Sequence, residues 1–471
     1  MSGRYVCLKN RFCLRGWKKL PYALEDKESG DVAFMMPGEF HTLKFCNGRF
    51  TEDSPMFGTE GRKHLEFLEK QGIIEFTDEP GKLEKDQEYF CYDNRFIRQI
   101  HWSMTGHCNY KCRHCYMSAP HAVLPDLDTD TCRKIIDDIA SCGIRHLSLT
   151  GGEVLIRRDF FELLDYMLEK DLKIVTIMSN GALVTEELLK ELEKRNCKPE
   201  FNMSYDGTEG WHDWLRGVEG ADEAVQRAFR LCKEHGFPTG SEMCLHKGNL
   251  HTLRDSVKLL GSLGVSRLKV CRLSCEGEGV ALKDKELSVE EEYEAYISYI
   301  PQYIEDGMPL KELMLADVFL AVDEGFAIPM EHYSEEEVCE DCYICLAARQ
   351  TMYLGPDGRI LPCVPMSETD YSQERFPLIS ELSIKEALED SSYINFIRVD
   401  LKEYREHNPG CGICEYKNRC AAGCRGRAVL HNNGADLLGI DPESCLFYKG
   451  GYYDRTKKLI EKYREIIFEK T

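Results

Sequence analysis

The sequence predicts an α/β fold whose centre is an open, TIM-like barrel of the partial (β/α)6 type. From about Arg98 to Leu273, short apolar segments alternate with segments whose apolar residues recur at helical spacing. This is the pattern of repeated βα units around a parallel sheet. Only six strand-like segments occur, fewer than the eight of a closed barrel. We therefore expect the chemistry at the carboxyl ends of these strands.

The barrel elements occupy residues 96–275. The expected strands are residues 99–105, 146–150, 173–178, 200–204, 241–245 and 267–272. The expected helices are residues 130–142, 158–170, 185–195, 221–235 and 250–263. The turns that follow the strands are consequently the first places to search for functional residues.

The first hundred residues show a different order. Strand-like segments at 32–36 and 40–45 precede a helix-like segment at 61–71 and a strand-like segment at 73–76. This order predicts a winged-helix-like domain over residues 1–95. A structural cap over the barrel is the alternative.

Three further regions follow the barrel. Residues 276–338 are acidic, and helical spacing at 290–300 and 310–322 predicts a helical bridge. Within residues 339–450, strand-like segments on either side of the Gly355–Gly358 turn predict a hairpin. Residues 451–471 are expected to form a packing helix.

Cys108, Cys112 and Cys115 follow the first expected strand with the spacing Cys-x3-Cys-x2-Cys. A [4Fe-4S] cluster normally takes four thiolates, so three would leave one iron open to a small molecule. With 23 cysteines in 471 residues, such a spacing can also arise by chance. A zinc site completed by His114 is the alternative that the residues allow.

A second cysteine set lies in the last third of the chain: Cys345, Cys363, Cys411, Cys414, Cys420, Cys424 and Cys445. These seven thiolates nearly complete two four-iron clusters. A zinc ribbon would explain the block from Cys411 to Cys424. It would explain neither the partner cysteines nor the upstream triad.

The triad resembles the signature of the radical S-adenosylmethionine (SAM) enzymes, and the second set resembles their C-terminal SPASM domain. This resemblance implies three [4Fe-4S] clusters, with SAM bound at the open iron of the triad. Cys345, Cys363 and Cys424 would hold the first auxiliary cluster, and Cys411, Cys414, Cys420 and Cys445 the second. The first would lack one ligand, for which we favour Cys339 over Cys342.

The resemblance also implies SAM-contacting residues at three strand ends. Gly151, Gly152 and Glu153 match the Gly-Gly-Glu motif, which would contact the SAM amino group. Ser179 and Asn180 follow the third strand, and Ser204 and Asp206 match a ribose-contacting segment. The segments at the third and fourth strand ends could each instead be a plain turn.

These features imply an oxidoreductase that cleaves SAM reductively to a 5′-deoxyadenosyl radical. Several radical SAM peptide maturases begin with a winged-helix element that binds the leader of a precursor peptide as an added strand. We therefore expect a peptide-modifying enzyme that forms a thioether or carbon–carbon crosslink, with flavodoxin or ferredoxin as electron donor.

The alternatives are an anaerobic sulfatase-maturing enzyme, a small-molecule dehydrogenase or decarboxylase, and an electron carrier without catalysis. Sulfatase-maturing members usually carry a carboxylate base where Val364 stands here, which disfavours that function. An electron carrier would give no reason for a three-ligand site beside a Gly-Gly-Glu turn.

Charge and hydropathy limit the partners. The formal net charge of -21 repels phosphate backbones, so we expect no nucleic-acid partner. The longest apolar stretch, near residues 313–322, contains Asp317 and is too short to cross a membrane. The first ten residues lack the apolar run of a signal peptide. We therefore expect a cytoplasmic protein, in which cysteines serve metal binding or catalysis rather than disulfides.

Overall fold

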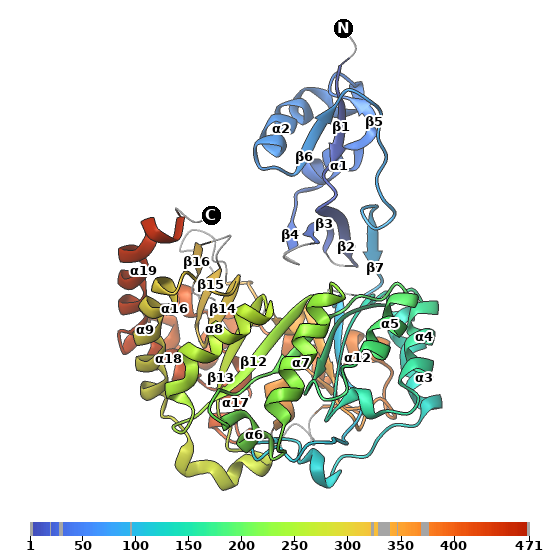
Figure 1. Cartoon of the computed structure of the whole chain (residues 1–471). Helices are drawn as coiled ribbons and strands as arrows, with labels where there is room; N and C mark the ends of the chain where they lie inside the picture. Colours follow the sequence, from blue (N-terminus) through green and yellow to red (C-terminus); the bar gives the residue numbers. More distant parts are fainter. Residues whose placement is uncertain are drawn as a thin grey trace. The chain divides into compact units, whose positions relative to one another are not determined.

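The computed structural model describes residues 3–18, 20–27, 32–94, 97–321, 325–327, 340–345, 347–368 and 376–468. The chain divides into two compact units, which we describe separately (Figure 1). The first contains Met1–Arg98 and Ser141–Ile144, and the second contains Gln99–Ala140 and Arg145–Thr471.

The first unit contains two small sheets and two helices. One sheet has the order β5-β1-β6, with bounds Asn47–Thr51, Tyr5–Leu8 and Ile74–Thr77. The other has the order β4-β3-β2-β7, with bounds Val32–Phe34, Leu20–Asp26, Phe12–Trp17 and Phe90–Tyr92. Helices α1 (Pro37–Phe45) and α2 (Gly58–Lys70) pack on them around a core that includes Val6, Phe40 and Leu65.

The predicted strand at residues 40–45 is wrong, because this segment belongs to helix α1. Pro37 stands in the first turn, and Glu39 accepts a hydrogen bond from the backbone N of Met36, as in a capping box. Phe40 and Leu43 are three residues apart and are both fully buried. The apolar residues here therefore follow helical spacing, which six residues were too few to reveal.

The second unit is built on one open sheet. The six predicted strands are present as parallel neighbours: β8 (Gln99–Ser103), β9 (His146–Thr150), β10 (Lys173–Ser179), β11 (Glu200–Ser204), β12 (Thr239–Leu245) and β13 (Arg267–Arg272). The predicted helices are also present: α3 (Thr129–Ser141), α4 (Phe160–Glu169), α5 (Glu186–Lys194), α7 (Ala221–Glu234) and α8 (Leu253–Leu263). The prediction of an α/β partial barrel is thus confirmed.

The sheet extends beyond six strands at both edges. Strand β14 (Glu312–Leu315) pairs parallel with β13, and the antiparallel strands β15 (Val318–Ala321) and β16 (Gly325–Ala327) follow. At the other edge, β17 (Thr351–Leu354) pairs parallel with β8, and β18 (Ile360–Leu361) completes the predicted hairpin. The barrel sheet and the cysteine-rich region therefore share one sheet.

The predicted helix at residues 310–322 is wrong, since this segment is the β14–β15 hairpin. Leu315 pairs with Val318, which leaves Ala316 and Asp317 as a two-residue turn with Ala316 at φ 48°. Burial alternates along β14, as expected for a strand with one face in the core.

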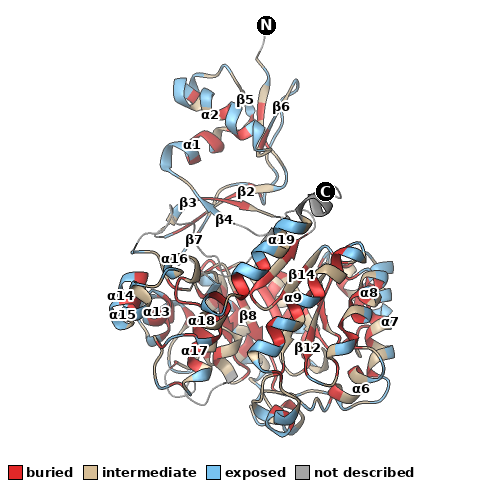
Figure 2. Cartoon of the chain, turned by 90° about the vertical axis from the view of Figure 1, so that its left-hand side faces the viewer, coloured by how far each residue is buried: buried red, intermediate tan, exposed pale blue. Residues whose placement is uncertain are grey.

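Helices supply most of the remaining structure. They include α6 (Trp211–Arg216), α9 (Val289–Glu305), α10 (Ala347–Gln350), α12 (Ile384–Glu389), α13 (Ser392–Ile397), α14 (Leu401–His407), α15 (Pro409–Gly412), α16 (Lys417–Cys420), α17 (Arg425–His431), α18 (Pro442–Lys449) and α19 (Tyr452–Phe468). Figure 2 shows buried residues concentrated on the strands and exposed residues on the outer sides of α9 and α19. Among the described residues, no helix is both long and apolar enough to span a membrane.

Candidate active site

A cavity of about 730 Å³ lies at the carboxyl ends of the barrel strands. Most of the residues that the sequence singled out for the triad and SAM line it: Cys108, Cys112, Cys115, Gly151, Gly152, Ser179, Asn180 and Ser204. These residues follow β8, β9, β10 and β11, which are neighbours in the sheet, and they therefore lie close together at one edge of it. This volume lies within the usual range for small-molecule and cofactor sites.

Each sulfur of the triad accepts a hydrogen bond from an N–H group. Backbone N–H groups donate to the Sγ atoms of Cys108 and Cys115 over 3.4 and 3.3 Å. The guanidinium of Arg216 donates to Sγ of Cys112 over 3.7 Å. Burial raises the pKa of the Cys108 thiol to about 12. The N–H donors and the positive charge of a bound metal group would together offset this burial and favour thiolates.

The Gly-Gly turn after β9 packs tightly on the triad loop. A Cβ atom on Gly152 would lie 2.1 Å from the carbonyl oxygen of His107 and 3.0 Å from Cβ of Cys108. A Cβ atom on Gly151 would lie 2.6 Å from the carbonyl oxygen of Thr105. These two positions therefore require glycine, because no side chain fits between the turn and the triad loop.

Glu153 and Asp206 are not among the described residues that line the cavity. Glu153 is fully buried and accepts hydrogen bonds from Oγ of Ser179 at 3.0 Å and from the backbone N of Asn180 at 2.8 Å. Asp206 is also fully buried and accepts a hydrogen bond from Nε of Arg216 at 2.6 Å. Each carboxylate therefore holds residues that line the cavity.

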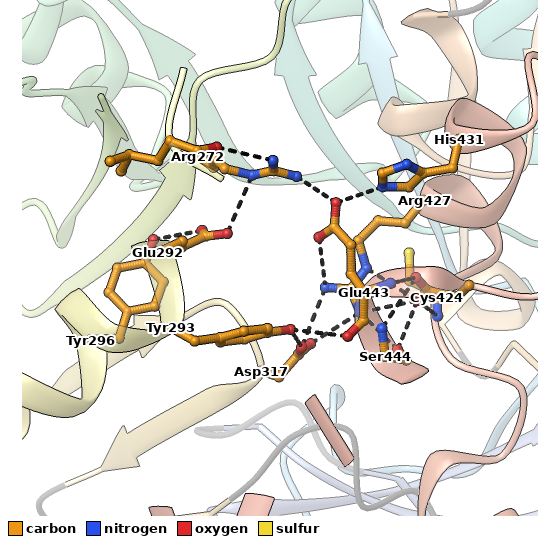
Figure 3. Close-up of polar contacts among 12 residues, drawn as sticks. Arg272, Glu292, Tyr293, Tyr296, Asp317, Cys424, Arg427, His431, Glu443 and Ser444 are labelled. Atoms are coloured by element: carbon orange, nitrogen blue, oxygen red, sulfur yellow. Dashed lines mark hydrogen bonds and ion pairs between the residues drawn. The ribbon is translucent and has the colours of Figure 1, made fainter. Parts of the chain in front are cut away.

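A second part of the cavity wall is charged, and it was not predicted from the sequence. Arg272, the last residue of β13, forms ion pairs with Glu292 at 3.3 Å and with Glu443 (Figure 3). It also forms an ion pair with Glu286 at 3.7 Å. His431 lies 2.7 Å from Glu443. Since His431 is on α17 and Glu443 on α18, this network joins the barrel to the C-terminal helices. Burial raises the pKa of Glu292 to about 7.

Four more residues line the cavity on adjacent strands: Glu242 and Cys244 on β12, and Lys269 and Cys271 on β13. Glu242 is paired across the sheet with Lys269, and Cys244 with Cys271. Their signal in the sequence is a polar residue or cysteine at every second position near the carboxyl end of a strand. Arg216 has no such signal, because it belongs to a short helix that only tertiary packing brings to the triad.

Cys411, Cys414, Cys420 and Cys445 line a separate pocket of about 140 Å³. Tyr404, Tyr416 and Tyr448 contribute to its wall, and the Tyr404 hydroxyl lies 3.7 Å from Sγ of Cys411. The four cysteines predicted to form one ligand set are thus brought together by three short helices and the turns between them.

Cys345, Cys363 and Cys424 also come near one another. Burial raises the pKa of the Tyr393 hydroxyl, and the nearby thiols of Cys345 and Cys363 raise it further. The Cys424 thiol similarly acts on Cys345. Cys342 packs beside Ile344 and Tyr404. Cys339 lies outside the described residues, so the choice between Cys339 and Cys342 stays a prediction.

The described cysteines do not converge on one point. Within the described parts of the chain, no group of three His, Cys, Asp or Glu side chains converges on the position of one metal ion. A zinc site needs its ligands within about 2.0–2.3 Å of one point. The triad thiols instead border a cavity that extends well beyond them.

The fold and the site define a parallel-barrel enzyme in which three thiols and a glycine turn border one ligand cavity. Residues 102–260 match the family description "Radical SAM superfamily". These residues therefore form a radical SAM domain, and the predicted radical SAM enzyme class is confirmed.

Three comparisons show which known proteins the chain is similar to. It is 29% identical to an AdoMet-dependent heme synthase of Methanosarcina barkeri over 75% of this chain and 97% of that protein. It is 24% identical to a PqqA peptide cyclase of Gluconobacter oxydans over 76% of this chain and 92% of that protein. Its fold is similar to that of Streptococcus suis SuiB bound to its precursor peptide SuiA, with a TM-score of 0.62, 16% identity and coverage of 93% and 99%.

Membership of the superfamily implies a [4Fe-4S] cluster and SAM at this site. The residues fit both groups. The three sulfur atoms have N–H donors, and the glycine turn leaves backbone exposed to the cavity beside them. When bound, the reduced cluster and SAM supply the radical chemistry that activates an otherwise inert C–H bond.

Proposed function

We propose that this enzyme oxidises a ribosomally made precursor peptide, forming a thioether or a carbon–carbon crosslink. The observation that carries the proposal is the first unit, most of which, Met1–Arg98, precedes the barrel in the chain. The likeness to peptide-bound SuiB covers 93% of this chain. The uncovered 7% is too small to contain the whole of this unit, so the likeness extends into it.

The proposal gives the first unit the role of binding the leader of the precursor. Its two sheets have edge strands, β5 and β6 in one and β4 and β7 in the other. An edge strand can pair with an extended peptide, which then joins the sheet as an added strand. The relationship to the PqqA peptide cyclase gives independent support for a peptide substrate.

The residues of the cavity have separate tasks under this proposal. Cys108, Cys112 and Cys115 hold the cluster, and the backbone of Gly151 and Gly152 together with Ser204 orients SAM. Glu153 and Asp206 act as positioning residues, through Ser179 and Asn180 and through Arg216 respectively. The remaining wall, with its charged network, would seat the substrate and exclude water.

We further propose three clusters, with two in the C-terminal region. Cys411, Cys414, Cys420 and Cys445 would hold one of them in the 140 Å³ pocket. Cys345, Cys363 and Cys424 would hold the other, with Cys339 as fourth ligand. Clusters near a substrate can take up the electron that a net oxidation releases. A flavodoxin or ferredoxin would supply the electron that starts the reaction.

A second candidate is a small-molecule reaction, favoured by the similarity to AdoMet-dependent heme synthase over nearly its whole length. That similarity covers 75% of this chain and therefore leaves room for the first unit to lie outside it. The two candidates differ in what the first unit does. A peptide enzyme needs it for substrate binding, whereas a small-molecule enzyme does not.

The test is anaerobic incubation of the reconstituted enzyme with SAM and dithionite. The substrates compared are Fe-coproporphyrin III and the peptides encoded by short reading frames beside this gene. We expect a peptide to lose two hydrogens for each crosslink, measured by mass spectrometry. An aldehyde would instead indicate a sulfatase-maturing reaction, and conversion of the porphyrin alone would establish the second candidate.

Truncation tests the first unit directly. A chain that begins at Asp93 keeps the hydrogen bonds of Asn94 Nδ2 to the carbonyl oxygens of Ile97 at 2.8 Å and Cys142 at 3.1 Å. We expect it to cleave SAM normally but to bind the peptide much more weakly. Equal binding of the peptide by both forms would contradict a role of this unit in recognition.

A further inference from the structure

Arg216 is the one guanidinium that contacts a sulfur of the triad among the described residues. Its Nη1 lies 3.7 Å from Sγ of Cys112, and the side chain borders the cavity. Only 11% of this side chain is exposed. A cation in such a dry place acts on its neighbours with little screening by solvent.

Helix α6, which ends at Arg216, is held against the triad loop by hydrogen bonds and close packing. The backbone N of Arg113 donates to the carbonyl oxygen of Leu215 at 2.8 Å, and Nε of Arg113 donates to that of Trp214 at 2.8 Å. Gly217 ends the helix with φ 66°, and a Cβ atom there would lie 2.2 Å from the carbonyl oxygen of Lys111. The end of α6 therefore packs directly on the triad loop, and this packing fixes the position of the Arg216 backbone.

Asp206 fixes the other end of the guanidinium. Its Oδ2 accepts from Nε of Arg216 at 2.6 Å, and its Oδ1 accepts from the backbone N of Cys244 at 2.9 Å. Nδ1 of His212 accepts from the backbone N of Asp206 at 3.0 Å and lies 3.3 Å from Oδ2 of Asp206. The Arg216–Asp206 pair is therefore held in place on its carboxylate side, and its positive end lies toward Cys112.

We propose that Arg216 is a positioning residue that raises the reduction potential of the cluster held by the triad. Reduction adds one electron, and hence one negative charge, to a cluster. A hydrogen bond and a positive charge at a ligand sulfur stabilise the reduced state more than the oxidised state. Asp206 directs the charge to Cys112 and keeps the side chain from turning into the cavity.

This inference requires only the triad and the cluster that the superfamily implies. It is therefore independent of whether the substrate is a peptide or a small molecule. The test uses the full-length, anaerobically reconstituted enzyme, with iron content measured for every variant. Dithionite titration with redox mediators, followed by EPR, gives the midpoint potential of the signal that changes when SAM is added.

We expect the midpoint potential of Arg216→Gln to be lower than that of the wild type. At a fixed potential at which only a small fraction of the cluster is reduced, we expect that fraction to fall roughly tenfold or more. This is the usual effect of losing a hydrogen bond to a charged group. Arg216→Lys retains the charge and should restore most of the difference. Lys111→Gln is the matched control, since Lys111 is an exposed cation next to Cys112 in the chain, and the midpoint potential of this variant should equal that of the wild type.

An unchanged midpoint in Arg216→Gln with full iron content would overturn the proposal. If Arg216→Gln does not assemble the cluster, a second measurement tests the proposal on the wild-type enzyme. In protein labelled with ¹⁵N-arginine, pulsed EPR of the reduced triad cluster should detect coupling to a guanidinium nitrogen. The absence of this coupling, or its persistence in Arg216→Lys, would equally overturn the proposal.

Discussion

The two cysteine sites of this enzyme differ in what surrounds their sulfur atoms. The triad borders a cavity of about 730 Å³ that continues along the barrel, whereas the four C-terminal cysteines line a pocket of only about 140 Å³. Glycine turns and polar residues border the triad, while tyrosines enclose the second pocket. The large site leaves space beside its cysteines for a further ligand, whereas the small one is confined by the tyrosines around its cysteines.

This difference follows from where each site lies in the fold. The triad loop follows a central strand of a parallel sheet, where neighbouring strand ends leave an open crevice. The C-terminal cysteines lie on short helices and the turns between them, and these helices, including α15, α16 and α18, pack against one another. The comparison teaches that cysteines at similar spacings can border an open cavity or an enclosed pocket, depending on the packing around them.

The largest expected effect separates the two sites by single substitutions. Cys112→Ala should abolish SAM cleavage, because the cluster loses a ligand where SAM must bind. Cys414→Ala should lower the iron content but leave SAM cleavage by the triad site largely intact. The measurement is 5′-deoxyadenosine formed on anaerobic reduction, together with iron analysis. Equal loss of SAM cleavage in both variants would contradict a functional difference between the two cysteine sites.

A second prediction concerns the buried carboxylate that supports the large site. Glu153→Ala leaves the donors on Ser179, Asn180 and Leu155 without their acceptor in a buried place. We expect a loss of about 2–4 kcal/mol in the free energy of unfolding, together with weaker SAM binding.

The control for this substitution is Glu169→Ala, since Glu169 is exposed at the end of helix α4. It should change the free energy of unfolding by less than about 0.5 kcal/mol. Urea denaturation and SAM binding measured by equilibrium dialysis would check both variants. A Glu153→Ala protein as stable as the control would show that its hydrogen bonds contribute little.

A third prediction uses the charged network between the two sites. Burial raises the pKa of Glu292 to about 7, against the lowering effect of Arg272 and Tyr296. The folded protein therefore binds this proton more tightly than the unfolded chain does, and the contribution is lost as the pH rises from about 4.5 to about 7. Each pH unit in this window corresponds to at most about 1.4 kcal/mol.

Glu292→Gln cannot lose a proton, so this part of the pH dependence should disappear. The stability of the variant relative to the wild type should therefore increase between pH 5 and pH 8. Thermal denaturation of the two proteins across this range provides the check. Parallel curves would mean that Glu292 titrates alike in the folded and unfolded states.

The smallest expected effect lies in the enclosed pocket. Tyr404→Phe removes only the hydroxyl that lies 3.7 Å from Sγ of Cys411. We expect full iron content and a small shift of the midpoint potential of the cluster proposed there, with SAM cleavage unchanged. EPR potentiometry would measure the shift, and a change in SAM cleavage would show that the two sites are more closely coupled than their separation in the fold suggests.

The sequence alone determined the barrel and much of the site. The six strands and five helices of the repeat were predictable because each has a local pattern of apolar residues, of period two or 3.6. The triad, the Gly-Gly turn and the four cysteines of the second pocket were predictable because their spacing is itself a chemical signal. The helix at residues 40–45 and the hairpin at 310–322 were missed because short apolar runs fit either period.

Only the tertiary structure decided which polar residues meet. Arg216 reaches Cys112 from more than a hundred positions away, and Arg272 meets Glu443 across an even longer separation. Glu153 and Asp206 were found by motif, yet their burial directs them toward supporting residues instead of the cavity. The physical reason is that side-chain contacts depend on how separate elements pack, whereas hydrophobic periodicity and ligand spacing are local properties of the chain.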